Sequence, residues 1–332
     1  MQDLVISEDD RRLINAMQVL PRANWTLLGS MLNADPVTLS RRWKRLEKHG
    51  LAWIGVYLAG DSIQSTALLE LRCPPSETTH IAQLIAHDPQ VLTVDLTTGG
   101  RDLLITLTCE RQEDLERYVL DRMRDLPQVS SMRTQIITSN RLIFDARTWR
   151  LNTLSDTEKI RLETHRAEEH ERISCQRQYR LRDGESTLIF SALQSNPRIS
   201  VKDLASRIGL PVQRAGALLD MLLDRGDIVL RPEIARPYSG TPLYAWLFLT
   251  VKSSEVASTV IRLARMRETR MTASIIGNYD IALAVWLKNL EDLQRLEAAL
   301  TSQLGVTVAD TSIVLRTSTH LHVRLNEHGL RA

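Results

Sequence analysis

Apolar residues recur at helical spacing close to the start of the chain. Leu13, Met17 and Leu20 form a stripe that is typical of an amphipathic helix packed on one side. Capping residues and left-handed stop positions predict two further helices, over residues 25–32 and 37–49. Three short helices with a tight turn between the last two predict a helix-turn-helix.

Strand-like apolar segments and helical stripes then alternate over the next 80 residues. Strands are predicted over 65–73, 91–97, 103–108 and 129–137, and helices over 77–87 and 115–126, in the order strand, helix, strand, strand, helix, strand. The same order returns over 246–251, 256–266, 272–276, 282–287, 293–304 and 306–315. The order βαββαβ predicts a ferredoxin-like sandwich, in which two helices cover one face of a four-stranded antiparallel sheet.

The chain is a tandem of two copies. Residues 10–54 match residues 186–230 without a gap, so that Pro21 falls on Pro197 and Gly50 on Gly226. A second match follows at an offset two positions larger, where Asp102 falls on Asp280. The fold class is therefore α+β, and the predicted domains are a first helix-turn-helix (1–60), a first sandwich (61–140), a charged helical linker (141–182), a second helix-turn-helix (183–240) and a second sandwich (241–320).

Composition and charge narrow the range of functions. The 332 residues are 43% hydrophobic, which excludes a disordered or low-complexity chain. Lys and Arg number 42 against 40 Asp and Glu, so any affinity for nucleic acid must come from local clustering. The cysteines Cys73, Cys109 and Cys175 are widely spaced, which argues against disulfides and fits a reducing cytoplasm. The start lacks the features of a signal peptide, and no apolar window is long enough to span a membrane.

The third helix carries the candidate DNA-binding residues. Over residues 37–50 it holds five Lys and Arg against one acid. A helix in the major groove needs cations that neutralise phosphates and polar side chains near its N-terminus that read base edges. The predicted contacts are Thr38, Ser40, Arg41, Arg42, Lys44, Arg45 and Lys48. A solvated amphipathic helix is the alternative interpretation of the same charges.

The corresponding helix of the second copy lacks this charge. It carries Arg214 and Arg225 but also Asp220 and Asp224, and its net charge is zero. Each missing cation removes up to one neutralised phosphate. The hypothesis is that the second helix-turn-helix mainly packs or touches DNA only secondarily.

The chain resembles the Lrp/AsnC family of feast/famine transcriptional regulators, in a double-length form. The resemblance rests on LSRRWKRLEKHG at 39–50, TGGRD at 98–102 and IGNYD at 276–280. It implies binding to double-stranded operator DNA, and sensing of an amino acid or other small effector by the sandwich domains, named RAM. It also implies association at least as a homodimer through the sheets, which can pair within one chain or between chains.

Effector binding is expected at the two glycine/aspartate hairpins. An α-amino acid needs an anionic acceptor for its ammonium and free backbone N–H groups for its carboxylate. The candidates are Gly99, Gly100, Asp102, Gly277, Asn278, Asp280 and Thr317. Alternatively, these Gly and Asp residues only satisfy tight turns.

Two alternatives to a regulator remain open. Fused proteins of this architecture resemble sirohaem decarboxylases, which carry a His-Asn-Tyr-type stretch, but the matching regions TVDLTTGGRD and TASIIGNYDI here contain no histidine. The other is an interaction module with vestigial helix-turn-helix domains. Because no catalytic or metal-binding motif is present, the expectation is a protein without enzymatic activity, cofactor or metal. His320 and His322 could share a strand face, but no third ligand is evident.

The linker is expected to be helical and mostly solvated. A capping box at Ser155–Glu158 predicts the start of its helix. Trp149 and Leu151 are expected to pin this segment to the first sandwich.

Overall fold

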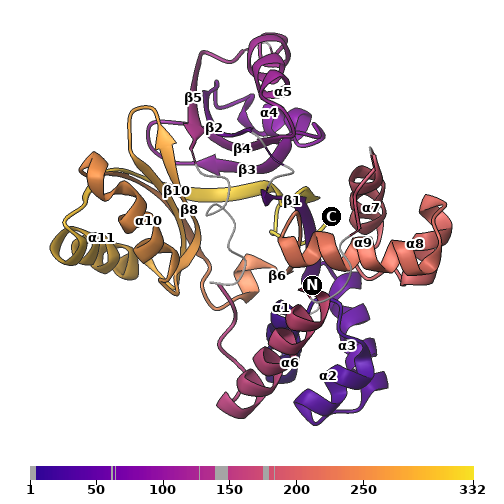
Figure 1. Cartoon of the computed structure of the whole chain (residues 1–332). Coiled ribbons are helices and arrows are strands. Elements are labelled where there is room, and N and C mark those ends of the chain that lie inside the picture. The colour runs from indigo at the N-terminus through magenta and orange to yellow at the C-terminus, as the bar shows by residue number, and fades with distance from the viewer. Residues whose placement is uncertain are drawn as a thin grey trace. The chain divides into compact units, whose positions relative to one another are not determined.

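The computed structural model describes residues 5–60, 63, 65–126, 128–138, 149–174, 179–182 and 184–332 (Figure 1). They form two compact units, and each unit is assembled from both copies of the repeat. One unit consists of Met1–Gly60, Arg150–Ala235 and Arg331, and the other of Asp61–Trp149, Arg236–Leu330 and Ala332. Both helix-turn-helix segments therefore lie in the first unit, and both βαββαβ segments lie in the second.

The first unit contains six helices of the two helix-turn-helix segments, the linker helix and two strands. Its elements are α1 (Glu8–Val19), α2 (Trp25–Leu32), α3 (Pro36–Lys48), β1 (Ala52–Leu58), α6 (Asp156–Ser174), α7 (Glu185–Ser195), α8 (Val201–Ile208), α9 (Val212–Arg225) and β6 (Ile228–Ile234). The predicted capping box of α1 is present, because Ser7 Oγ accepts the Asp10 N–H and Asp10 accepts the Ser7 N–H. The turn between α2 and α3 passes through Asn33 in the left-handed region, as expected.

Strands β1 and β6 join the two helix-turn-helix segments. They pair antiparallel, and the register places Gly55 opposite Arg231, which are equivalent positions of the two copies. A local two-fold axis therefore passes through this pair. Both strands are largely buried along their length. The sequence AWIGVYL is nearly all apolar and shows no alternation, so its periodicity does not predict β1.

Two equivalent arginines reinforce this two-fold axis. Arg22 donates from Nη1 and Nη2 to the carbonyl oxygens of Pro197 and Ile199, each at 2.6 Å. Arg198 returns the same pair of bonds to the carbonyl oxygens of Pro21 and Ala23, also at 2.6 Å. Burial and the nearby Arg22 cation lower the pKa of Arg198 to about 10. Each copy thus caps the loop between the first two helices of the other copy.

The linker helix α6 packs within this unit. Its predicted capping box is present, because Ser155 Oγ accepts the Glu158 N–H at 3.3 Å and Glu158 accepts the Ser155 N–H at 2.8 Å. Leu162 is completely buried, and the Leu151 N–H donates to Gln18 Oε1 at 2.9 Å. Leu151 is thus anchored to the first helix-turn-helix, and its expected anchoring to the first sandwich was wrong.

The second unit contains both predicted sandwiches. The first supplies β2 (Ser65–Arg72), α4 (Thr78–Ile85), β3 (Val91–Thr97), β4 (Leu103–Cys109), α5 (Gln112–Arg117), the π-helical turn η2 (Tyr118–Arg122) and β5 (Ser131–Ile137). The second supplies β7 (Leu243–Thr250), α10 (Val256–Ala264), β8 (Thr269–Ile276), β9 (Ile281–Leu287), α11 (Leu290–Leu304), β10 (Thr307–His320) and β11 (Val323–Arg324). The short 3-10 turns η3 (Arg236–Tyr238) and η4 (Ser253–Glu255) flank β7. The order βαββαβ is confirmed in both copies.

The two sheets pair with each other inside one chain. The strand order is β11-β10-β3-β4-β2-β5-β8-β9-β7, and β10 also pairs with β7, so the strands close into a ring. One junction pairs β10 with β3 from Val314 to His320, whereas the other pairs β5 with β8 only at Ile136 and Ile137. Pairing within or between chains was left open from the sequence, and the structure shows pairing within the chain. Association of whole chains into a homodimer stays a prediction.

Each sheet has its own helix-covered core. In the first, Leu69, Ile105 and Val94 pack with Ile81 and Ile85 of α4. The second core is built in the same way from residues of β7, β9 and α10, which are Leu247, Leu283, Val260 and Leu263. The opposite faces of the two sheets meet each other, which answers the need of a one-sided sheet for a cover.

Two predicted elements differ from the structure. The helix expected over 115–126 begins earlier, at Gln112, and passes into η2, where Tyr118 Oη and Arg122 Nε donate to Asp88 at 2.9 and 3.0 Å. The last strand of the second copy continues to His320, beyond its expected end at Leu315, because it pairs with β3. In the described ranges, no helix is long and apolar enough to cross a membrane.

Replacing Arg198 by Ala should destabilise the first unit. The variant leaves the half-buried carbonyl groups of Pro21 and Ala23 without these donors, and leaving a buried group unpaired costs ~1–3 kcal/mol, which sets the upper limit here. The measurement is the midpoint of urea unfolding followed by circular dichroism, with the exposed Arg207→Ala as the control. Equal midpoints for both variants would show that the reciprocal arginines do not hold the two copies together.

Candidate functional site

Helix α3 is held rigidly with one face outward. Its N-cap Asp35 accepts the Thr38 N–H at 2.7 Å, and Pro36 occupies the first helical position. Leu39, Trp43 and Leu46 are buried. A side chain on Gly29 would meet the Ala34 carbonyl oxygen at 2.7 Å, so the turn between α2 and α3 requires glycine there.

A stripe of cations lies on the outward face of α3. Arg41, Lys44 and Lys48 follow one another at helical spacing, and all three are exposed. Within the described residues they take part in none of the ion pairs. Thr38 is exposed and Ser40 half-buried, near the N-terminus of the helix. Val37, which was not among the predicted contacts, is 65% exposed and is the apolar start of the same stripe.

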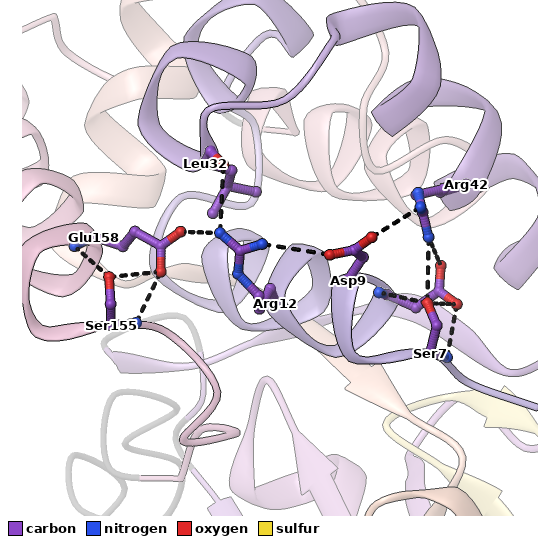
Figure 2. A network of polar contacts seen from close by, with 8 residues as sticks. Ser7, Asp9, Arg12, Leu32, Arg42, Ser155 and Glu158 are labelled. Atoms are coloured by element: carbon purple, nitrogen blue, oxygen red, sulfur yellow. Dashed lines mark hydrogen bonds and ion pairs between the residues drawn. The ribbon is translucent and has the colours of Figure 1, made fainter.

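Two of the predicted DNA contacts are engaged within the protein. Arg42 Nη2 lies 3.0 Å from Asp9 Oδ2 (Figure 2). Arg42 Nη1 lies 3.4 Å from Asp10 Oδ1. Arg45 Nη2 contacts Asp10 Oδ2 at 2.5 Å. Arg42 is thus paired with the acidic first turn of α1, and its contact with DNA stays a prediction that has to compete with these ion pairs. Arg45 shares this partner but keeps 47% of its side chain exposed.

The charge of Asp10 is stabilised by these contacts. Its side chain is fully buried, which by itself disfavours the ionised form. Hydrogen bonds from Ser7 and from Arg45 outweigh burial and hold the pKa of Asp10 below its ordinary value. Acids at the start of α1 are visible in the sequence as SEDD, but their pairing with α3 depends on the tertiary fold.

Arg214 in the second recognition helix, α9, also has internal partners. Its Nη2 lies 2.8 Å from Glu185 Oε2, and its guanidinium lies 5.9 Å from the centre of the Tyr179 ring. Only 19% of its side chain is exposed. The ion pair raises the pKa of Arg214, so it remains a cation, but one committed to α7.

The aspartates of both hairpins accept hydrogen bonds from backbone N–H groups of their own sandwich domains. Asp102 Oδ2 accepts the Cys73 N–H at 2.8 Å, and Asp280 Oδ2 accepts the Val251 N–H at 2.9 Å. These are equivalent bonds in the two copies. Each carboxylate thus satisfies a backbone donor at the end of the neighbouring strand, as the alternative interpretation of a tight turn expects, and binding of a ligand ammonium by Asp102 or Asp280 stays a prediction.

The remaining hairpin positions have diverged between the copies. Gly99 adopts φ +89°, whereas Gly277 does not have positive φ and lies against the side chain of Gln135. Gly100 is exposed, and its carbonyl accepts Arg72 Nε at 2.7 Å. Asn278 is exposed. No common ligand geometry unites the two turns.

Thr317 belongs to a buried group between the two sheets. Its Oγ1 donates to Asp95 Oδ1 at 2.7 Å, and Trp246 Nε1 donates to Asp95 Oδ2 at 3.0 Å. Burial raises the pKa of Asp95, although both hydrogen bonds favour its ionised form. Burial and the neighbouring Asp95 also raise the pKa of Tyr244. We call Asp95, Tyr244, Trp246 and Thr317 the inter-sheet cluster. Asp95 was not predicted from the sequence, because nothing in the alternation of β3 marks which face meets the second sheet.

A second polar group joins the sheets around Arg101. This side chain is 3% exposed, and its Nε lies 3.1 Å from Glu70 Oε2. Its Nη1 donates to Ser312 Oγ at 2.9 Å, and its guanidinium lies 4.2 Å from the centre of the Phe248 ring. The divergence of Arg101 from its equivalent Tyr279 thus serves the contact between the two copies.

Trp149 packs on the second sandwich. The guanidinium of Arg270 lies 3.9 Å from the ring centres of both Trp149 and Trp286. The expectation that Trp149 is pinned to the first sandwich was therefore wrong. A cation between two indole rings is a strong anchor.

The described residues contain no cluster of three or more His, Cys, Asp or Glu that could hold a metal ion. His322 follows the end of β10 with φ +63°, so it does not share a strand face with His320. Burial lowers the pKa of His322 to about 4 and raises the pKa of Cys73 and of Cys109 to about 11.

Comparison with known families identifies both kinds of domain. Residues 66–143 match the Lrp/AsnC ligand binding domain, and residues 187–228 match a winged helix-turn-helix DNA-binding domain. The fold and these matches define a helix-turn-helix protein with ligand-binding domains. These domain matches, and the HTH-type regulators among the relatives, confirm the resemblance to the Lrp/AsnC family that was drawn from the sequence.

The curated relatives are about half as long as this chain. The uncharacterized HTH-type transcriptional regulator PH0140 of Pyrococcus horikoshii is 26% identical over 139 residues, which are 40% of this chain and 87% of that protein. The HTH-type transcriptional regulator AldR of Mycolicibacterium smegmatis is 24% identical over 138 residues, 40% of this chain and 81% of that protein. A single copy of the repeat therefore corresponds to most of each relative.

A solved structure that matches almost the whole chain is that of an enzyme. The siroheme decarboxylase NirDL, in complex with an iron-uroporphyrin III analogue, has a TM-score of 0.57, 13% sequence identity, and coverage of 95% of this chain and 93% of that chain. The same decarboxylase in its other structure gives a TM-score of 0.53 at 14% identity. The expectation of a protein without enzymatic activity, which rested on the absence of catalytic motifs, is therefore corrected, because the shared fold is one on which an enzyme is built.

The inter-sheet cluster should make stability depend on pH. The raised pKa of Asp95 means that the folded protein binds a proton more tightly than the unfolded chain, so stability is lost as pH rises above the unfolded value of ~3.9. Asp95→Asn removes this loss. Urea unfolding from pH 4 to pH 7 should show the variant gaining stability relative to the wild type as pH rises, whereas the exposed Asp121→Asn should not. A constant difference across the range would contradict the raised pKa.

Proposed function

We propose that this protein is a sequence-specific DNA-binding regulator that reads the major groove with α3. The observation that carries the proposal is the outward stripe of Arg41, Lys44 and Lys48 on a rigidly capped recognition helix. Cations at this spacing can neutralise phosphates on one side of the groove. Arg45 is half-engaged with Asp10 and adds charge at the edge of the stripe.

The N-terminal turn of α3 supplies the groups that discriminate between bases. Thr38 and Ser40 offer hydroxyl groups, and the exposed methyl groups of Val37 suit contact with a thymine methyl. The backbone N–H of Thr38 is already bonded to Asp35, so only its side chain is free to reach a base. Phosphate contacts would set the register, and these three side chains would contribute the specificity.

A small effector is proposed to act on the RAM-type domains. The match of residues 66–143 to an Lrp/AsnC ligand binding domain supports this, and an amino acid is the effector class that the resemblance implies. Because the aspartates of both hairpins are bonded within their domains, recognition would rely on the exposed backbone of Gly99, Gly100 and Asn278.

A decarboxylase-like enzyme is the second candidate. The observation in its favour is the likeness of fold to NirDL over 95% of the chain. It would require binding of a tetrapyrrole, which gives a direct spectroscopic test.

Removing the cations of the stripe should weaken DNA binding. In Arg41→Ala/Lys44→Ala/Lys48→Ala, affinity for a fluorescein-labelled duplex should fall on the order of tenfold or more, and the slope of log K against log salt should decrease by ~0.9 for each phosphate that is no longer neutralised. Fluorescence anisotropy measures both quantities. The matched control is Lys202→Ala/Arg207→Ala/Arg225→Ala, which removes three exposed cations of the second copy. Equal decreases in both variants would contradict the assignment to α3.

Ligand titration should separate the two candidate functions. A regulator with a small effector should show an increase in melting temperature with at least one of the twenty amino acids, since a ligand that binds only the folded state stabilises it. Iron-uroporphyrin III should leave the melting temperature and the Soret band unchanged. A saturable shift of the Soret band would instead support the decarboxylase candidate and oppose the amino-acid effector.

A further inference from the structure

The second recognition helix differs from the first on its DNA-facing side. Lys44 and Lys48 of α3 are replaced at equivalent positions of α9 by Asp220 and Asp224. Whereas both lysines are exposed, only 34% of the Asp220 side chain and 18% of the Asp224 side chain are accessible. This face of α9 is therefore both acidic and covered.

The linker helix α6 provides the cover. His170 Nδ1 is bonded to Asp224 Oδ1, and Arg172 Nη2 lies 4.0 Å from Asp220 Oδ2. Burial raises the pKa of Asp220 despite the nearby Arg172 cation. The two acids thus meet basic groups of α6 at the positions where the first copy presents cations to solvent.

The beginning of α6 is fixed to the first copy. Glu158 lies in its first turn and accepts Arg12 Nη2, while Arg12 Nη2 also lies 3.4 Å from the Leu32 carbonyl oxygen (Figure 2). Ser155 holds the same carboxylate from the other side, and burial of Leu162 secures the next turn. The helix is therefore anchored at one end on α1 and at the other on α9.

Electrostatics also disfavour DNA at this second position. The last twelve residues of α6, 163–174, carry four glutamates against two arginines. Together with Asp220 and Asp224 they place negative charge where phosphates would approach. No such cover contacts the exposed stripe of α3 among the described residues.

We infer that α6 covers the face of α9 that would otherwise contact DNA. One chain then presents a single recognition helix, α3, to a duplex and recognises a single half-site. The inference rests on the proposed function. Two helices related by a two-fold axis ordinarily read an inverted repeat one helical turn apart. Here the axis through Gly55 and Arg231 relates one uncovered helix to one covered helix, and the binding site of one chain is asymmetric.

The test combines selection of DNA sites with a cross-link that holds α6 in place. The variant His170→Cys/Asp224→Cys is made together with Cys175→Ser, and a short bifunctional thiol reagent then cross-links the two introduced cysteines. Cys73 and Cys109 are buried, so the reagent has little access to them. Cross-linked and wild-type full-length protein are then used to select sites from a random duplex library. Sedimentation of the selected complexes gives the number of chains per duplex, and anisotropy gives the affinity.

The expected result is one half-site for each bound chain, with affinity unchanged within about twofold on cross-linking. An inverted repeat bound by one chain would overturn the inference but not the proposed function, as would a drop in affinity on the order of tenfold on cross-linking. Failure of both proteins to select any duplex would reject the proposed function, and the inference with it. A His170→Cys/Asp224→Cys protein without reagent controls for the substitutions themselves.

Discussion

Pairing of each copy with the other is the constraint on which the structure depends. Neither β1 nor β6 has a second partner strand in the described chain, and each four-stranded sheet has its second face covered by the sheet of the other copy. Both units are therefore formed jointly by the two copies. In the first unit this pairing joins β1 to β6, with Gly55 opposite Arg231. In the second unit it joins the two sheets into a ring that β10 closes. An unpaired strand edge would otherwise be open to other chains.

Within this symmetric frame the two copies have diverged in charge. The apolar positions that hold each helix-turn-helix together are kept, since Leu39 and Leu46 have the counterparts Ala215 and Leu222, all buried. The solvent-facing positions are not kept. In the sandwiches an inter-sheet position has diverged as well, because Arg101 and Tyr279 differ, yet both reach Asp310, with Arg101 at 2.5 Å and Tyr279 at 3.3 Å. The conserved apolar packing thus keeps the two copies paired, while the charges on the outer faces of α3 and α9 differ.

Local signals were sufficient to predict most of the fold. Caps such as Ser7 with Asp10, and the strand boundaries of β3, depend on neighbouring residues and could be taken from the sequence. The strands β1 and β6 could not, because residues buried on both sides leave no alternation. The partners of Arg42 and Asp95 lie 33 and 222 positions away in sequence, at Asp9 and Thr317, and only the tertiary fold brings them together. The sequence therefore predicted the cations of α3 but not the internal ion pairs of Arg42, and it did not predict the inter-sheet cluster.

The reciprocal bonds of Arg22 and Arg198 have a consequence that follows from their lying on one polypeptide. Two separate chains held by such contacts would come apart on dilution and could exchange partners with related proteins. A covalent tether keeps the effective concentration of the second half high at any amount of protein in the cell. Each copy of the repeat is therefore always paired with the other, different copy. A single gene thus encodes an asymmetric pair, which two identical subunits could not form.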